Sequence, residues 1–292
     1  MRSIFPDLLE RQGEPAAIAT LVDKTGSAPL PVGSAMVVWR DGTVRGWISG
    51  GCVDSDVVAV AERVLLDGVA EIREYGPPSL MGVGLTCGGQ LRVLVEPVYP
   101  ELLTAAAAVV SDRAVTLSTD LSTGSHSLSW SSGEGFSLHG STFVAGFAPR
   151  PLLVIVSATA VTNPLAQLAS SFGWRVVVVE HRPVFAAQIS CDVVPRLDGL
   201  VLDRRSAVAV LSHDPMVDVP AIMAAFAASC GYVGAMGSAV THVDRVRRLR
   251  AAGASDGDLA RLRSPIGSAG VGGRSPVELA VAIGVELGVA AV

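Results

Sequence analysis

The stretch Gly46-Trp47-Ile48-Ser49-Gly50-Gly51-Cys52-Val53-Asp54 joins a predicted pair of strands to a predicted helix. Residues 34–48 read as two short strands with a turn at Asp41-Gly42, and the paired glycines that follow let the backbone turn sharply. Residues 57–66 have helical spacing and good helix formers, which places Cys52 near a helix N-terminus. The partial positive charge of such a terminus favours a thiolate and bound anions.

A second turn of similar composition, Cys87-Gly88-Gly89, precedes a strand predicted over residues 90–96. Its order mirrors that of Gly50-Gly51-Cys52, and two such turns in one small domain predict a shared site with the glycine pairs as its walls. A scaffold role is the alternative, because free cysteines are common small core residues and glycine pairs are common in plain turns. We expect Cys191 and Cys230 to lie in the core.

Composition bounds the class of protein. The chain has 292 residues, half of them hydrophobic, which predicts two domains with ample cores. A net charge of −5 without a long basic run argues against nucleic acid binding, and the Arg245–Arg250 cluster reads as the solvated face of a helix. Four scattered cysteines without a CxxC pair exclude a zinc ribbon and fit reduced thiols. Pro and Gly residues interrupt the most apolar stretch, residues 219–243, so we expect a cytoplasmic protein without a membrane span.

The predicted fold class is α/β, with a mixed α+β N-terminal domain followed by a Rossmann-like domain with a parallel sheet. Residues 1–100 form the first domain, and residues 101–150 form a Ser/Gly-rich connecting segment that contains short strands. From residue 151 to residue 292 the pattern becomes strand, helix, strand. The continuous apolar run at residues 152–156 is typical of a parallel strand that is buried on both faces.

The first strand-helix-strand unit of this second domain has nearly the length that a dinucleotide-binding fold uses, and Glu180 follows it where a ribose 2′-OH would be held. The glycine fingerprint is absent, because the chain reads Ser157-Ala158-Thr159-Ala160 at its position. A β-branched residue at Thr159 stiffens the turn and fills the space that a pyrophosphate needs. We therefore expect no NAD(P) binding, and an NAD(P)-dependent oxidoreductase is the alternative.

Another candidate pair, His213 and Asp214, follows the strand predicted over residues 207–211. Open α/β sheets bind ligands at the carboxyl ends of their strands, which favours a role in binding. The alternative is that Asp214-Pro215 only starts a turn.

Separated motifs in both domains carry a resemblance that covers nearly the whole chain. They are Gly26-Ser27-Ala28-Pro29, Gly33-Ser34-Ala35-Met36, Ser49-Gly50-Gly51-Cys52-Val53-Asp54, Cys87-Gly88-Gly89, Glu96-Pro97, Ser212-His213-Asp214, Tyr232-Val233-Gly234-Ala235-Met236-Gly237-Ser238, Ser264-Pro265-Ile266-Gly267 and Ser275-Pro276-Val277-Glu278-Leu279-Ala280. Through them the chain resembles the xanthine dehydrogenase accessory proteins, the XdhC/CoxI family. The resemblance implies a chaperone more than an enzyme. Such a chaperone binds the molybdenum cofactor (molybdopterin), supports its sulfuration by a cysteine desulfurase and helps to insert it into a molybdenum hydroxylase apoenzyme such as xanthine dehydrogenase.

This cofactor is large and anionic, so it calls for backbone N–H donors, a helix N-terminus and soft thiolate ligands. The candidate metal ligands are Cys52 and Cys87. The candidate cofactor-binding residues are Gly50, Gly51, Cys52, Asp54, Cys87, Gly88, Gly89, His213 and Asp214. An apolar C-terminal helix suggests a homodimer.

The chain departs from the family pattern mainly in the second domain. Ser157-Ala158-Thr159-Ala160 replaces the usual Gly-Ala-Gly-His, and Ala239 replaces an arginine. These departures leave open a diverged paralogue that binds a partner protein without cofactor.

Overall fold

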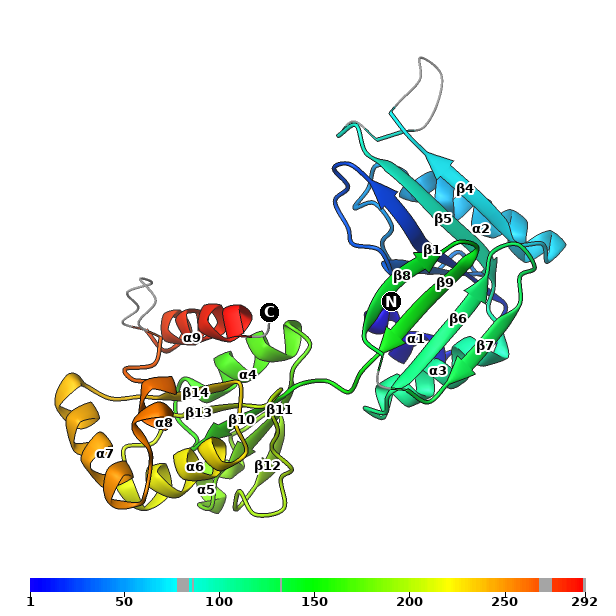
Figure 1. The fold of residues 1–292 in the computed structure, drawn as a ribbon. Helices are drawn as coiled ribbons and strands as arrows, with labels where there is room; N and C mark the ends of the chain where they lie inside the picture. The colour runs from blue at the N-terminus through cyan, green and yellow to red at the C-terminus, as the bar shows by residue number, and fades with distance from the viewer. Residues whose placement is uncertain (78–83, 86, 132, 268–274, 291–292) are drawn as a thin grey trace. The chain divides into compact units, whose positions relative to one another are not determined.

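The computed structural model of the protein describes residues 1–77, 84–85, 87–131, 133–267 and 275–290. The chain divides into two compact units, Met1–Pro149 and Arg150–Val292 (Figure 1). Within the described residues, the helices fall short of the length and hydrophobicity needed to span a bilayer.

An antiparallel sheet of five strands, in the order β3-β2-β1-β5-β4, forms the centre of the first unit. Its strands are β1 (Ala16–Thr25), β2 (Ala35–Trp39), β3 (Val44–Gly46), β4 (Glu71–Tyr75) and β5 (Gln90–Pro97). Helix α2 (Asp54–Asp67) lies against one face of the sheet. It buries Val57, Val60 and Val64 there, residues that recur at helical spacing.

Strands β1 and β5 pair along almost their whole length, from Ala17 opposite Pro97 to Thr25 opposite Gln90. Because the strands are antiparallel, the last residue of β1 lies beside the first residue of β5. The loops that leave β1 and enter β5 therefore meet at one edge of the sheet.

Residues 100–147 add a helix and a second sheet to the same unit. Helix α3 (Pro100–Val110) packs with η1 (Arg2–Ile4) and α1 (Phe5–Glu10) on the face of the first sheet opposite α2. The second sheet, in the order β7-β6-β9-β8, consists of β6 (Val115–Asp120), β7 (His126–Ser129), β8 (Gly135–His139) and β9 (Thr142–Phe147). Its buried Phe143 and Phe147 share a core with Phe5 and the first sheet. The Ser/Gly-rich segment expected at residues 101–150 thus packs into this unit, because its alternating strands have an apolar face to bury.

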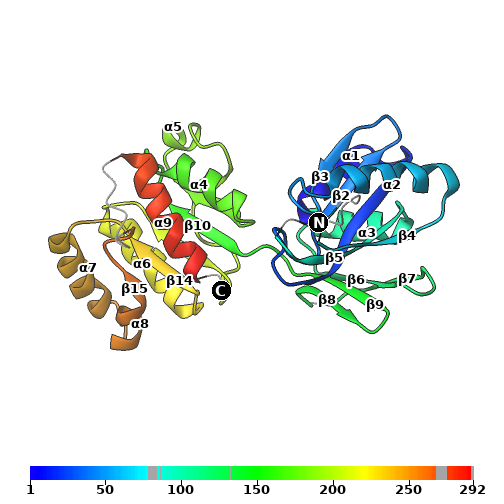
Figure 2. The same cartoon turned by 90° about the horizontal axis from the view of Figure 1, so that it is seen from above.

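Six parallel strands form the sheet of the second unit, in the order β12-β11-β10-β13-β14-β15. They are β10 (Leu152–Val156), β11 (Arg175–Val179), β12 (Asp192–Val194), β13 (Ala207–Val210), β14 (Tyr232–Ala235) and β15 (Leu262–Arg263). Helices α4 (Thr162–Ser171) and α9 (Pro276–Ala290) cover one face, and α6 (Pro215–Ala227) and α7 (Ala239–Ala251) cover the other (Figure 2). The short helices are α5 (Pro183–Ala186) and α8 (Asp256–Arg261).

This arrangement confirms the predicted fold class, a mixed first part followed by a Rossmann-like parallel sheet. The strand order reverses between β10 and β13, which creates the crevice where such sheets bind ligands.

A buried polar group connects the two sheets of the first unit. Glu96 of β5 is 5% exposed, and its Oε2 lies 3.3 Å from Nε2 of His126 on β7. The His126 ring stacks on Tyr99, and its Nδ1 lies 3.2 Å from Oγ1 of Thr119 on β6. Burial raises the pKa of Glu96 to about 8, although a hydrogen bond with Tyr99 opposes the shift. Burial also lowers the pKa of His126, so both side chains are neutral near pH 7.

The stability of the first unit should therefore depend on pH through Glu96. Its folded pKa lies above its ordinary value of 4.5, so between pH 4.5 and about 8 the folded carboxyl keeps a proton that the unfolded one has lost. The Glu96 contribution to stability is complete below pH 4.5 and falls as pH rises, by up to about 1.4 kcal/mol per pH unit. We expect Glu96→Gln to gain stability relative to the unsubstituted protein across this window.

Urea denaturation at several pH values measures this difference, with Glu10→Gln on the exposed surface of α1 as the control. A pH-independent difference between Glu96→Gln and the unsubstituted protein would contradict a neutral Glu96.

Candidate functional site

The turn that carries Cys52 depends on two glycines in left-handed conformations. Gly50 has φ 72° and Gly51 has φ 116°, values that strain residues with a side chain. Helix α2 begins at Asp54, two residues after Cys52, and the Cys52 side chain is exposed. The thiol therefore lies just before the first helical turn, on the surface.

Asp54 lies beneath this turn and holds it. Its buried carboxylate accepts hydrogen bonds from the N–H groups of Ile48 at 2.8 Å and Gly51 at 2.7 Å, and from both the N–H and the hydroxyl of Ser49. The Ser49 hydroxyl oxygen accepts in turn from the N–H of Val53 at 2.9 Å. Burial acts to raise the pKa of Asp54, but the hydrogen bonds outweigh it and the pKa lies below its usual value. Whether Asp54 also contacts a cofactor stays a prediction, and its visible role is to shape the turn.

The second cysteine turn packs against the loop that leaves β1. The Cys87 thiol is exposed and donates a hydrogen bond of 2.9 Å to the carbonyl oxygen of Ser27. Gly88 has φ 75°, whereas Gly89 is required by space, because a Cβ atom there would lie 2.0 Å from the same Ser27 oxygen. Each glycine of the pair thus has its own physical reason.

The loop Gly26-Ser27-Ala28-Pro29 borders both cysteine turns. A Cβ atom at Gly26 would lie 3.4 Å from Cα of Gly89, and one at Gly50 would lie 4.0 Å from Cβ of Pro29. The structure therefore brings the two turns to opposite ends of one four-residue loop at the edge of the first sheet. The loop stands out in the sequence as a motif. Its position between the two cysteine turns, however, follows only from the pairing of the strands. A cavity shared by both thiols stays a prediction.

Among the described residues, no group of three or more His, Cys, Asp and Glu side chains is placed to hold a metal ion. Cys52 and Cys87 therefore do not belong to such a group within the described part of the chain. The assignment of Cys52 and Cys87 as metal ligands stays a prediction.

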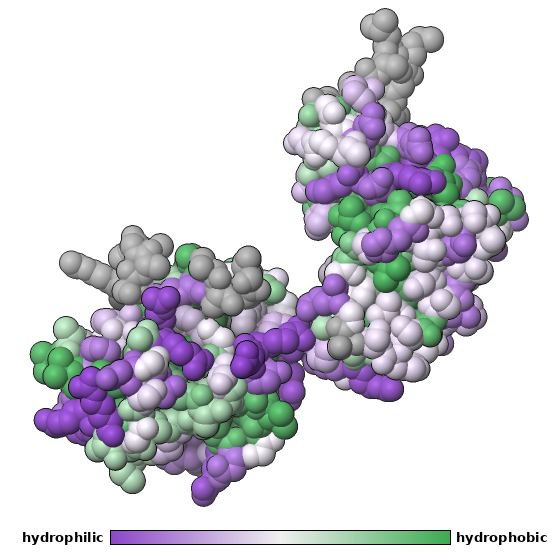
Figure 3. Space-filling view, in the orientation of Figure 1, coloured by the Kyte–Doolittle hydropathy of each residue, from purple (hydrophilic) through white to green (hydrophobic). Residues whose placement is uncertain are grey.

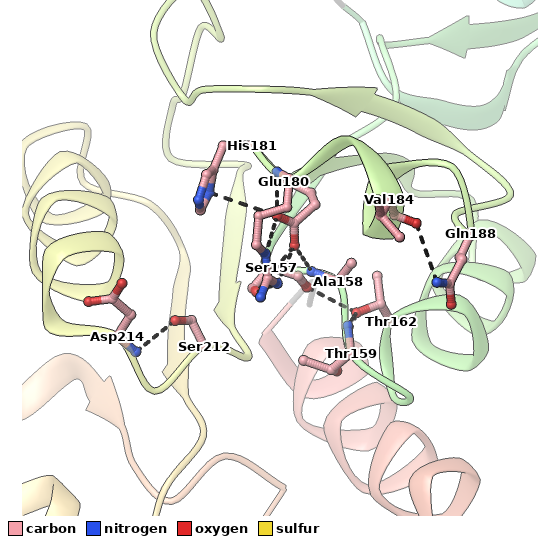
Figure 4. A network of polar contacts seen from close by, with 11 residues as sticks. Ser157, Ala158, Thr159, Thr162, Glu180, His181, Val184, Gln188, Ser212 and Asp214 are labelled. Carbon is pink, nitrogen blue, oxygen red and sulfur yellow. Dashed lines mark hydrogen bonds and ion pairs between the residues drawn. The ribbon is translucent and has the colours of Figure 1, made fainter.

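A second candidate site is a cavity of about 490 Å³ in the Rossmann-like unit, at the carboxyl ends of the central strands. Asp214 lines the cavity, whereas the exposed His213 lies outside its lining. The Asp214 carboxylate caps α6 by accepting from the N–H of Met216 at 2.9 Å. The N–H of Asp214 donates to the hydroxyl of Ser212 at 2.9 Å (Figure 4). Of the expected pair, Asp214 thus borders the cavity, and a role of either residue in binding cofactor stays a prediction.

The loop between β10 and α4 hydrogen-bonds to itself and to Glu180. The N–H of Ala158 donates to Glu180 at 2.8 Å, and that of Thr159 donates to the Thr162 hydroxyl at 2.9 Å (Figure 4). The N–H of Val161 donates to the Thr159 hydroxyl at 3.2 Å. In a dinucleotide-binding fold, N–H groups at this position point at the pyrophosphate. Here the protein's own oxygen atoms satisfy them.

The Glu180 carboxylate also has a side-chain partner, Arg182, which the sequence analysis did not predict. The Arg182 guanidinium donates to its buried carboxylate through Nε at 2.8 Å and Nη2 at 2.7 Å. This bidentate pair holds the pKa of Glu180 at about 2. A basic residue two positions after the acid at the strand end is the signal that could have identified the pair. The carboxylate that would receive a ribose is thus neutralised within the protein.

The basic cluster lies mostly on a solvated face of α7, as expected, because Arg247, Arg248 and Arg250 are exposed, and Arg245 is the exception. Arg245 is 4% exposed and donates to Asp218 at 2.9 Å and to the carbonyl oxygen of Met236 at 2.8 Å. Burial raises the pKa of Asp218 despite this partner. The pair fixes the loop after β14 against α6, so it supports the sheet edge near the cavity.

Comparisons with known proteins agree with this architecture. The family model described as XdhC Rossmann domain matches residues 153–287, and the one described as XdhC and CoxI family matches residues 9–76. The molybdenum cofactor insertion chaperone PaoD of Escherichia coli (strain K12) is 30% identical over 87% of this chain and 77% of its own. A protein of Bacillus subtilis (strain 168) described as a probable xanthine dehydrogenase subunit is 25% identical over 96% of this chain and 94% of its own. The crystal structure of a xanthine dehydrogenase from Bacillus halodurans has a TM-score of 0.80 at 24% identity, covering 98% of this chain and 94% of its own, which shows the shared fold.

The role of Asp54 in shaping the Cys52 turn leads to a prediction about stability. Asp54→Ala leaves several buried donors without an acceptor, so we expect the free energy of unfolding to fall by about 2–4 kcal/mol. Urea denaturation followed by circular dichroism measures the loss. Glu62→Ala on the exposed face of α2 is the control and should change stability by less than about 0.5 kcal/mol. An equally small effect at Asp54 would mean that the turn does not need its carboxylate.

Proposed function

Because the chain belongs to the XdhC and CoxI family, we propose that it is a chaperone that binds the molybdenum cofactor and delivers it to a molybdenum enzyme of the xanthine dehydrogenase type. The observation that carries this proposal is the 30% identity, over 87% of this chain, to a relative described as a molybdenum cofactor insertion chaperone. The cofactor is cargo in this function, so the protein must bind it reversibly and needs no catalytic group for redox chemistry.

The edge of the first sheet is the site that we propose for the metal end of the cargo. Two exposed thiols, Cys52 and Cys87, stand on turns that border one loop. Thiolates are soft ligands that suit a soft metal centre, and the cargo's own dithiolene would supply further sulfur ligands. No group of three or more metal-ligating side chains lies among the described residues, so in this proposal the ligands of the cargo complete the coordination of the metal.

We further infer that sulfuration of the bound cofactor takes place here, with a cysteine desulfurase as the partner that donates sulfur. Exposed thiols fit this role because the donor enzyme must reach the metal.

The exposed valines Val277, Val281 and Val285, spaced four residues apart on α9, support a homodimer or client contact through that helix.

The competing function, an NAD(P)-dependent oxidoreductase, finds little support in the Rossmann-like unit. The N–H groups of Ala158, Thr159 and Val161 already have acceptors, and Glu180 is paired with Arg182. A dinucleotide would have to break these hydrogen bonds to replace them with its own. A diverged protein that binds only a partner remains the alternative that cofactor analysis tests.

We predict that NAD and NADP bind with dissociation constants weaker than about 1 mM, because each new contact must first break an internal hydrogen bond. Isothermal titration calorimetry with either dinucleotide measures this affinity. A micromolar dissociation constant would contradict the proposed state of the loop, and Glu180→Ala would then show whether the ribose contact is responsible.

For the cofactor itself, we predict that Cys52→Ala and Cys87→Ala each lower the molybdenum bound after anaerobic purification from a cofactor-producing host by about tenfold. Each substitution removes one soft ligand. The half-buried Cys191 provides the control, since Cys191→Ala should leave the metal content unchanged.

Metal analysis and pterin fluorescence on the same preparations give the readout. Undiminished cofactor in both variants would move the site away from the cysteine turns, and unsubstituted protein without any cofactor would overturn the chaperone function.

A further inference from the structure

A polar hollow lies on the first sheet, next to the edge where the two cysteine turns meet. Its volume is about 330 Å³, and it is lined by the last residues of β1 and β4 and the first residues of β5. The register places Asp23 and Glu74 on either side of Arg92, and places Thr25 beside Gln90. Because side chains alternate along a strand, these five residues share one face of the sheet. Figure 3 shows hydrophilic surface in this part of the first unit.

The hollow forms because one lining residue is a glycine and the side chains of two others point into the core. Gly76, directly after β4, lines it, and a Cβ atom there would meet no atom of the described residues within 4 Å. Leu91 and Tyr75 alternate with the polar residues and are buried in the core beneath α2. The space over Gly76 is therefore open, while the sheet below it is closed.

The hollow contains a donor that lacks an acceptor. Within the described residues, Nε of Arg92 is buried and has no hydrogen-bond partner, and Oε1 of Glu74 is 3.8 Å away. A buried donor without an acceptor destabilises the protein. An acceptor on a ligand would remove this penalty, and the donor thus favours a bound molecule.

We propose that this hollow binds the pterin ring of the cofactor through its 2-amino-4-oxopyrimidine edge, an assignment that rests on the proposed function. That edge presents two adjacent N–H donors, the 2-amino group and N3–H, with acceptors on either side at N1 and the 4-oxo oxygen. The carboxylates of Asp23 and Glu74 accept from the donors, and the Arg92 guanidinium donates to the acceptors. The volume lies within the range of small-molecule sites.

The position of the hollow matches the site assigned to the metal. Cys87 comes three residues before Gln90, and Gly26 follows Thr25 directly. The segments that line the hollow therefore continue into the turns and the loop that present the thiols. One edge of one sheet would hold both ends of the same molecule.

The test fills the hollow or changes its charge and leaves the thiols in place. Gly76→Leu projects a side chain into open space, and Asp23→Asn removes an acceptor with little change of shape. The matched control is Gly257→Leu in the second unit, where an added Cβ atom meets only Oγ of Ser255, at 3.7 Å. Each variant is checked by thermal unfolding. Binding of neopterin, a metal-free pterin, is measured by fluorescence, and cofactor is measured after anaerobic purification.

We expect Gly76→Leu and Asp23→Asn each to weaken neopterin binding and lower bound cofactor by about tenfold, with no change in the control. Cys87→Ala should lower bound cofactor and leave neopterin affinity unchanged, because neopterin carries no metal. Unsubstituted protein that carries cofactor, together with folded variants that keep both properties, would overturn the hollow as the pterin site and leave the chaperone function standing. Unsubstituted protein without cofactor would overturn the chaperone function and this assignment with it.

Discussion

The antiparallel pairing of β1 with β5 is the constraint on which the first unit depends. It places Thr25 opposite Gln90, so the loop that leaves one strand meets the turn that enters the other. The hydrogen bond from Cys87 to Ser27 and the close approach of Gly89 to the same residue follow from this pairing. The same pairing aligns Asp23 with Arg92 and so creates the polar face of the hollow. A shift of one residue would exchange the buried and exposed faces of both strands.

The second unit keeps a nucleotide-binding architecture and uses its polar groups internally. Hydrogen bonds within the loop after β10 and the pair between Glu180 and Arg182 take up the groups that a dinucleotide would need. Asp218 and Arg245 similarly fix a neighbouring edge of the sheet. Buried charges persist only when they are paired, so these contacts stabilise a preformed sheet edge without a ligand. These groups are therefore engaged within the protein itself.

Several features of both units could be predicted because they depend on neighbours in the chain. The glycines at positions 50, 51 and 88 indicate sharp turns, and each has a left-handed backbone conformation. The apolar run at residues 152–156 predicts a central parallel strand, which β10 is. Thr159 marks a departure from the glycine fingerprint, and its hydroxyl and N–H form hydrogen bonds within that loop. Each of these inferences needs only backbone sterics and local periodicity.

By itself, the sequence determined the two fold types, the glycine turns and the family, because local conformation and the order of motifs depend only on residues near one another in the chain. Only the tertiary structure decided which distant groups meet. It packed residues 101–147 into the first core, buried Arg245 within an apparently basic face, and paired Glu180 with Arg182. It also placed Asp54 beneath the Cys52 turn as an internal acceptor. The physical reason is that strand register and burial set these contacts, and both depend on the whole fold rather than on any one segment.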